Sequence, residues 1–287
     1  MKNTFLIFVL LVSVILQACN QTTEETVNDL NQKNQKPEGI MAYYNAFTQP
    51  VDGKFMLKSY TTLASQDFDG SNVIEGYFFD KNGKPVAGGE IKLGNLSLKP
   101  DTKNSNCFCS DYRDKFAGKS LHGNTIKISI TPPPPASNLR VSANDTTSSE
   151  IYIPILVKIT TPSGFVNSPD QPFMPLKAGD QIGWNVDEKN KKGVIILLQY
   201  DPLHENNKYL QAQGVLVNKT AKVAKAITVN DYEGVYTYSS DDLKDFPANA
   251  YVSLTIGRAN FDNLKSGDAN YMFYAYTVVD SNYQLKR

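Results

Sequence analysis

Residues Gly193–Tyr200 read GVIILLQY, an apolar stretch that lacks the alternation of a strand with one face in water. A short run that is apolar on both faces is typical of a central β-strand. Further short strand patterns with turn residues between them occur in this part of the chain, among them Gln181–Val186, Val235–Tyr238, Tyr251–Ile256 and Tyr271–Val279. Ile151–Ile159 is also expected to form a strand, with Pro154 indicating an edge position or a bulge. No long amphipathic helix is indicated. The sequence therefore predicts a mainly β fold with a β-sandwich in its C-terminal part.

Strand patterns also occupy the N-terminal part of the chain. Val73–Phe79 is followed by the turn residues Asn82-Gly83 and then by Glu90–Leu93. Asn-Gly between two apolar runs is a strong signal for a β-hairpin, because both residues tolerate a positive φ. Asn124–Ile130 places three isoleucines at alternate positions, on one face of a strand. We therefore expect a first β module over residues 40–131.

Four consecutive prolines, Pro132 to Pro135, separate these two groups of strands. Proline cannot donate to a β-ladder, and a proline run favours a semi-rigid polyproline II spacer. We interpret residues 132–136 as a linker before a second module, a sandwich over residues 137–287. Two other interpretations stay open: a crossing between the sheets of one larger domain, or a ligand for another protein.

The second module resembles immunoglobulin-like and fibronectin-like domains at two places. The only tryptophan, Trp184, lies on an early strand, before a polar turn and a strongly apolar strand. Asp231–Tyr236 (DYEGVY) is similar to the D-x-G-x-Y tyrosine corner, with one inserted residue. The resemblance implies structural roles for Trp184 and Tyr236, with the Tyr236 hydroxyl bonded to backbone upstream. Tyr238 stands where antibody domains have cysteine, so the disulfide-bearing class is excluded. We thus expect two Ig-like sandwich modules.

The N-terminus carries an export signal. Lys2 precedes the almost entirely apolar run Phe5–Leu16, which is too short to span a membrane as a helix but fits a signal peptide. The run ends in Leu16-Gln17-Ala18-Cys19, which resembles the lipobox of bacterial lipoproteins. The resemblance implies that residues 1–18 are removed and that Cys19 is lipidated, commonly with a palmitate among its acyl chains. Asn20 is similar to the pattern sorted to the outer membrane of diderm bacteria, with the leaflet left open.

The residues after this signal predict a flexible tether over residues 19–39, because large apolar side chains are scarce there. The chain has 29 basic and 29 acidic residues, and removal of Lys2 leaves 28 against 29, a net charge of −1. This balance argues against a nucleic-acid partner. It also means that lipid, rather than basic residues, would attach the protein to a membrane. We therefore expect a cell-envelope localisation.

Two cysteines, Cys107 and Cys109, remain after lipidation of Cys19. In an oxidising compartment they are candidates for a disulfide, although an extended strand would hold their Cα atoms near the upper distance limit for one. A soft-metal site that adds His122 is a second interpretation, and it lacks the further ligands that zinc prefers. A redox role is the third.

Catalytic signatures are scarce. We find no nucleophile elbow, no phosphate-binding glycine loop and no dinucleotide fingerprint, and neither His122 nor His204 stands in a recognisable triad. Calcium-like spacing at Asp67, Asp69 and Ser71 lacks the closing glutamate, and Asn185, Asp187 and Asn190 form only a similar polar turn.

The function predicted from these observations is non-catalytic binding, adhesion or structural service at the envelope, without cofactor or metal. Tyr274 and Tyr276 on the aromatic strand are the candidate ligand platform for a glycan or an envelope protein. The alternatives are an envelope hydrolase acting on glycan or peptide, and a soft-metal or redox lipoprotein that uses Cys107 and Cys109.

Overall fold

The structure is a computed structural model. It describes residues 49–62, 71–101, 104–109, 121–133, 146–162, 173–216, 221–266 and 268–286. The expected signal peptide (1–18), the lipidation site Cys19, the tether (19–39) and residues 134–136 of the expected linker lie outside the described residues. Within the described ranges the protein is mainly β, as predicted.

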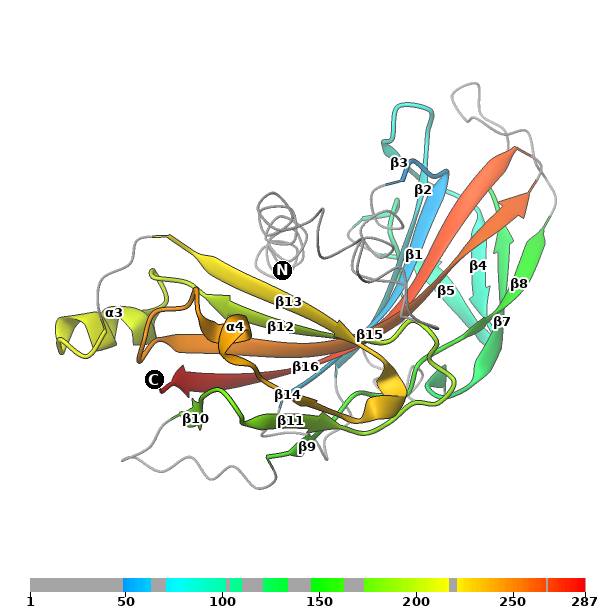
Figure 1. The fold of residues 1–287 in the computed structure, drawn as a ribbon. Coiled ribbons are helices and arrows are strands. Elements are labelled where there is room, and N and C mark those ends of the chain that lie inside the picture. Colours follow the sequence, from blue (N-terminus) through cyan, green and yellow to red (C-terminus); the bar gives the residue numbers. More distant parts are fainter. Residues whose placement is uncertain are drawn as a thin grey trace.

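The strands of the described ranges form one large mixed sheet of thirteen strands and one small sheet of three. Figure 1 shows them along the chain. Their bounds are β1 Gly53–Thr62, β2 Ser71–Phe79, β3 Pro85–Val86, β4 Glu90–Leu93, β5 Leu96–Pro100, β6 Phe108–Cys109, β7 Thr125–Thr131, β8 Thr147–Tyr152, β9 Ile159–Thr161, β10 Met174–Leu176, β11 Gln181–Trp184, β12 Val194–Tyr200, β13 Val223–Val229, β14 Val235–Thr237, β15 Tyr251–Ser266 and β16 Ala269–Leu285. The helical elements are α3 Glu205–Ala212, the 3-10 helix η3 Asp231–Glu233 and α4 Ser240–Leu243.

The hairpin of β15 and β16 crosses the whole molecule (Figure 1). The two strands contain 16 and 17 residues and pair antiparallel from Tyr251↔Gln284 to Ser266↔Ala269. β12 continues the large sheet beside β15, and β1 runs parallel to β16 from Gly53↔Tyr271 to Thr62↔Asp280. The hairpin is therefore shared by two halves of the protein, each with its own hydrophobic core.

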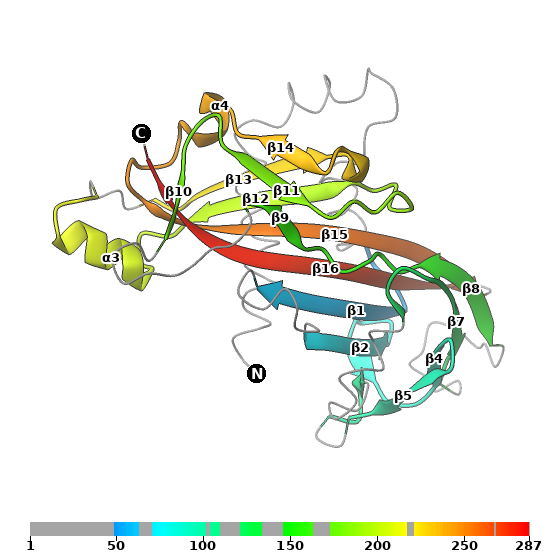
Figure 2. The same cartoon turned by 90° about the horizontal axis from the view of Figure 1, so that it is seen from below.

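One half of the protein, which we call the sandwich half, is a β-sandwich. Its small sheet, in the order β14-β11-β9, lies against the part of the large sheet formed by β13, β12, β15 and β16 (Figure 2). The core between them includes Ile182 and Trp184 from the small sheet and Val194, Ile196 and Ile256 from the large one. The strand GVIILLQY becomes β12, flanked by β13 and β15, so its predicted central position is confirmed.

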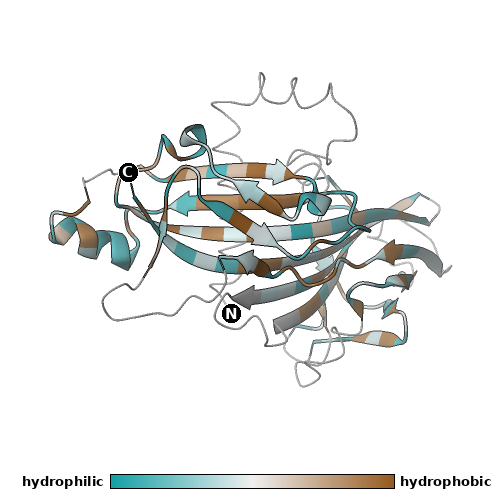
Figure 3. Ribbon diagram, turned by 60° about the horizontal axis from the view of Figure 1, so that its bottom comes forward, coloured by the Kyte–Doolittle hydropathy of each residue, from teal (hydrophilic) through white to brown (hydrophobic). Residues whose placement is uncertain are grey.

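The other half, which we call the barrel half, is curled like a barrel. The large sheet continues from β16 through β1, β2, β6, β5, β4 and β7 to β8. β8 then returns to the far end of β15, where Asn260 Nδ2 donates to Tyr152 O at 2.9 Å and Thr147 Oγ1 donates to Lys265 O at 3.0 Å (Figure 2). Apolar and polar segments alternate along these strands (Figure 3), and Ile126, Ile128 and Ile130 point into this second core as predicted.

The expected division into two self-contained sandwiches is not what the structure forms. Leu264, Tyr271, Phe273 and Ala275, all from the C-terminal hairpin, belong to the core of the barrel half. Pro132 and Pro133, the described part of the expected linker, are buried directly after β7. The sequence patterns marked only parts of β15 and β16, and their full lengths join the two halves into one sheet.

A second difference concerns the expected strand Ile151–Ile159. β8 ends at Tyr152 and β9 begins at Ile159, so Ile153–Lys158 belongs to neither sheet. This crossover segment contains Pro154, which has no N–H group to give to a ladder. It passes from the barrel half to the sandwich half, and its backbone groups need partners outside the sheets.

Candidate functional site

A row of polar side chains crosses the inner face of the large sheet between the two cores. Ser59 of β1 is paired with Thr277 of β16, and Thr277 is paired with Arg258 of β15. All three residues are almost fully buried, and Arg258 is only 1% exposed. We call these residues, with the side chains that bind them or the crossover segment, the polar belt. It replaces apolar packing at the position where the two halves meet.

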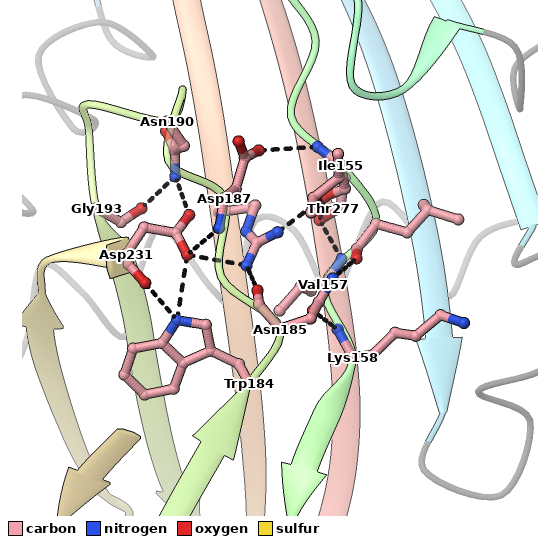
Figure 4. A network of polar contacts seen from close by, with 12 residues as sticks. Ile155, Val157, Lys158, Trp184, Asn185, Asp187, Asn190, Gly193, Asp231 and Thr277 are labelled. Atoms are coloured by element: carbon pink, nitrogen blue, oxygen red, sulfur yellow. Dashed lines mark hydrogen bonds and ion pairs between the residues drawn. The ribbon is translucent and has the colours of Figure 1, made fainter. Parts of the chain in front are cut away.

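The polar belt supplies the hydrogen bonds that the crossover segment lacks (Figure 4). Thr277 Oγ1 accepts from Val157 N at 3.0 Å and donates to Ile155 O at 3.3 Å, while Asp187 Oδ2 accepts from Ile155 N at 3.0 Å. Asn185 binds the same segment twice, donating to Leu156 O at 2.9 Å and accepting from Lys158 N at 2.6 Å. These side chains therefore make the backbone hydrogen bonds that a neighbouring strand would otherwise make to the crossover segment.

A buried ion pair lies at the centre of the belt. Arg258 Nη2 is 2.9 Å from Asp231 Oδ1, and the guanidinium also donates to the carbonyl oxygens of Ile155 and Asn185. Asp231 accepts further bonds from Trp184 Nε1, from Asp187 N and from Asn190 Nδ2. Burial lowers the pKa of Arg258 and raises that of Asp231, but each charge opposes the shift of the other. Because arginine starts from so high a pKa, Arg258 remains protonated at neutral pH.

His122 and Ser59 form a second polar contact beneath the crossover segment. His122 Nδ1 lies 2.8 Å from Pro154 O, and Nε2 lies 2.8 Å from Ser59 Oγ. A carbonyl oxygen can only accept, so in neutral His122 the proton is on Nδ1 and the Ser59 hydroxyl donates to Nε2. Burial lowers the pKa of His122, which favours this neutral form. His122 therefore has the tautomer that it would need as the base of a serine nucleophile. Ser59 is fully buried, however, so we assign the hydrogen bond between Ser59 and His122 a structural role.

The belt also fixes two loops that reach the surface. Asn185–Gly193 follows β11, and Asn230–Val235 contains η3; we call them the paired loops. They are joined by bonds from Trp184 N to Gly234 O at 2.9 Å and from Asn190 Nδ2 to Asp231 Oδ2 at 2.8 Å. Gly234 has φ +67°, and a Cβ there would come within 2.9 Å of Val186 Cγ2. The two loops therefore pack as one rigid unit.

Tyr232 projects from this unit into solvent, with 67% of its surface exposed. Its hydroxyl oxygen accepts a bond from Asn230 Nδ2 at 3.0 Å, and the same amide donates to Glu233 Oε1 at 3.3 Å. Val186 and Val235 are also exposed, and they lie on the same paired loops. The buried Asp231 directly precedes Tyr232, so the belt holds the backbone from which this aromatic side chain extends.

Exposed large apolar side chains fall in two groups in the part of the chain that the structure describes. One group is Val186, Tyr232 and Val235 on the paired loops, and the other is Leu203, Tyr209 and Val215 around α3. Tyr209 is 66% exposed, which matches Tyr232. Only the paired-loop group is connected to the buried polar belt.

The side chains predicted as a ligand platform are not at the surface. Tyr274 is 1% and Tyr276 is 8% exposed. Tyr274 packs with Val51 and Met272, and the Tyr276 hydroxyl lies 3.1 Å from that of Tyr60. Side-chain packing, rather than strand pairing, therefore closes this face of β16, and neither ring is open to solvent as the platform would require.

No disulfide joins Cys107 and Cys109, so the candidate bridge is absent from the structure. Cys109 belongs to β6 and Cys107 directly precedes it, and this extended backbone keeps their side chains apart. Burial raises the pKa of the Cys107 thiol, which disfavours the reactive thiolate. Both ring nitrogens of His122 are engaged elsewhere, and the described ranges contain no group of three metal-ligating side chains.

The structure also corrects the predicted tyrosine corner. The Tyr236 hydroxyl donates to Asp242 Oδ2 at 2.7 Å, a side chain downstream rather than backbone upstream. The cause is the capping box of α4, in which Ser239 N and Ser239 Oγ also donate to Asp242 Oδ2. Burial alone would raise the pKa of Asp242, but the bonds from Ser239 and Tyr236 outweigh it and lower the pKa. Trp184, the other residue predicted as structural, lies in the sandwich core.

Tyr236→Phe and Tyr238→Phe should differ in stability, because the first removes a hydrogen-bonded hydroxyl and the second removes one without a hydrogen bond among the described residues. Tyr236→Phe removes a bond to an ionised carboxylate, and we expect a loss of about 1–2 kcal/mol in the free energy of unfolding. Tyr238 is buried and its hydroxyl has no hydrogen-bond partner among the described residues, so Tyr238→Phe should leave stability unchanged or increase it. Urea midpoints measure both. Equal losses at the two positions would contradict this assignment.

Sequence reasoning missed most of the belt and all of the paired-loop surface. Asn185, Asp187 and Asn190 were recognised as a polar turn, and the structure uses them to bind the crossover segment and Asp231. Ser59 and His122 are 63 positions apart, and no local pattern joins them. Tyr232 lies inside the sequence that was interpreted as a tyrosine corner. Its position in a turn was the only sequence signal that its side chain would be exposed.

Comparison with known proteins gives no relative on which to build. No family model matches the chain, and no curated protein matches it. Among the described residues, no helix combines the length and the apolar character needed to cross a bilayer. The functional conclusion therefore rests on the site itself.

Proposed function

We propose that the protein is a lipid-anchored cell-envelope protein that binds a partner without catalysis, through the paired-loop surface around Tyr232. Lipid attachment at Cys19 is supported by the lipobox-like sequence Leu16-Gln17-Ala18-Cys19. An outer-membrane destination in a diderm bacterium is supported by Asn20. Two or three acyl chains would suffice for stable attachment.

The exposed Tyr232 on a rigid support is the observation that carries the binding role. Tyrosine is enriched among residues that dominate binding energy, since it combines a large apolar ring with a polar hydroxyl. The hydrogen bond from Asn230 and the anchoring of Asp231 reduce the freedom that Tyr232 would lose on binding. Less freedom to lose means a smaller entropic cost of association.

A protein partner fits this surface better than a glycan. Val186 and Val235 expose aliphatic groups on the same paired loops as Tyr232, and such groups offer no hydrogen bonds to sugar hydroxyls. Glu188, Lys189, Lys191 and Glu233 are exposed on the same loops and provide charges of both signs. A surface that combines an aromatic ring and aliphatic groups with charged groups is typical of a protein–protein interface.

Lipid attachment is tested by Cys19→Ala. Because the thiol is the acceptor of the diacylglyceryl group, we expect the variant to lose acyl labelling and to move from the membrane fraction to the soluble envelope fraction. Labelled fatty acid and cell fractionation measure the two effects. A variant that stays membrane-bound, together with an unlabelled wild type, would contradict the anchor.

Binding is tested by Tyr232→Ala against the matched control Tyr209→Ala. Both tyrosines are about equally exposed, at 67% and 66%, so both variants should fold like the wild type. We expect Tyr232→Ala to weaken capture of the partner from envelope extracts by at least about tenfold, as for a central interface tyrosine. Tyr209→Ala should retain it. Co-sedimentation with purified peptidoglycan distinguishes a glycan partner, and equal capture by both variants would refute the proposed surface.

A further inference from the structure

Two buried oxygen atoms at one end of the barrel half lack a hydrogen-bond donor. They are Asp52 Oδ1 and Asn270 Oδ1, and neither has a partner in the part of the chain that the structure describes. The two residues are locked together, since Asp52 N donates to Asn270 O at 2.7 Å and Asn270 N donates to Asp52 Oδ2 at 2.8 Å. A third bond, from Phe79 N to Asp52 O at 2.8 Å, attaches the end of β2.

Asp52 is half-buried, and its arrangement differs from that of the two buried carboxylates of the polar belt. Both oxygens of Asp231 and both oxygens of Asp187 accept hydrogen bonds from donors in the polar belt. Asp52, in contrast, takes part in no ion pair with another described residue. Its negative charge adds to burial in raising the pKa of the neighbouring Tyr271 to about 12.

The chemistry of these atoms restricts what could satisfy them. A carboxylate oxygen and an amide oxygen are both acceptors, and a cation offers the positive charge that both lack. Carboxylate and amide oxygens are ligands that Ca²⁺ prefers, and Ca²⁺ sites of extracellular modules are often weak and completed by water. We propose that Asp52 Oδ1 and Asn270 Oδ1 form a binding site for a hard divalent cation, Ca²⁺. The ion would join β1 and β2 to the tip of the β15–β16 hairpin.

The first test is thermal unfolding of the full chain in EDTA and in millimolar CaCl2. Binding to the folded state alone raises Tm, and we expect a rise of about 2–4 °C for the wild type. Asp52→Asn keeps the shape of the side chain but removes the charge, so it should abolish the response. Asp80→Asn is the matched control: Asp80 Oδ1 accepts from Asn82 N and Lys84 N in the β2–β3 turn, and this variant should respond like the wild type.

The second test uses Tb³⁺ as a luminescent substitute for Ca²⁺. Tyr271 adjoins Asp52 and should sensitise Tb³⁺ emission, which Ca²⁺ should displace and Tyr271→Phe should reduce. Asn270→Ala provides a second ligand variant if Asp52→Asn folds poorly, and it should lower the emission at least severalfold. No Tm response in the wild type would overturn the proposal, because a buried water or a reoriented Asn270 amide would then satisfy the oxygens. An equal response in wild type, Asp52→Asn and Asp80→Asn would overturn it as well.

Discussion

Replacement of Arg258 by methionine should lower the free energy of unfolding by about 3–5 kcal/mol, the loss expected when one partner of a buried ion pair is removed. Methionine retains much of the volume, so the loss is mainly electrostatic. Asp231 would keep a buried charge without its cation, and the carbonyl oxygens of Ile155 and Asn185 would each lose the hydrogen bond from Arg258. Urea unfolding followed by the fluorescence of Trp184, which contacts Asp231, measures the change.

Lys244→Met is the control for this substitution. Lys244 pairs with Asp241 at 3.6 Å on the surface, where both side chains are mostly exposed. The same loss of a cation should change stability by only about 0.5 kcal/mol or less there. A loss for Arg258→Met no larger than that of Lys244→Met would contradict the assigned role of the polar belt.

A fragment that starts at Ala136 should fail to fold cooperatively. It retains the β15–β16 hairpin but removes β1, which pairs with β16 over ten residues from Gly53↔Tyr271 to Thr62↔Asp280. It also exposes Tyr271, Phe273 and Leu264, whose partners in the barrel core are lost. Exposure of each large side chain costs about 1.5–3 kcal/mol, against a total stability of only about 5–15 kcal/mol. Circular dichroism during urea titration should show no sharp transition.

A fragment that starts at Ile40 is the matched control for this truncation. It lacks the expected signal peptide and tether but keeps every described strand, so it should unfold in one sharp transition. Independent, cooperative folding of the fragment from Ala136 would instead support two separate modules with a linker at the prolines.

Local sequence patterns predicted the strands whose surroundings match their composition. GVIILLQY became the interior strand β12, and the alternating isoleucines of Asn124–Ile130 point into the barrel core. The second half of β15 was not predicted, and the crossover segment was expected to be part of a strand. Residues 257–266 of β15 include Asn260, Asp262 and Asn263, and asparagine and aspartate are depleted in strands. Here they are tolerated because their partners come from distant parts of the chain.

The candidate site depended on contacts that no local pattern records. β1 and β16 pair in parallel although Gly53 and Tyr271 are separated by most of the chain. That pairing brings Ser59 beside Thr277, and it places Tyr60 of β1 where its hydroxyl contacts that of Tyr276, one of the two tyrosines that the sequence had favoured as a ligand platform. Helix α3 was also missed, since its sequence ENNKYLQA is largely polar, and Asn207 attaches it to β15 by bonds to the backbone of Tyr251.

The central claim is that the shared hairpin and the polar belt make both halves one cooperative unit that supports the paired loops. Hydrogen exchange of the wild type, measured by mass spectrometry at increasing urea, tests it most directly. Amides of β7 in the barrel half and of β12 in the sandwich half should open with the same free energy and the same dependence on urea. Opening free energies that differ by more than about 2 kcal/mol between β7 and β12 would show that the halves unfold separately and would contradict the claim.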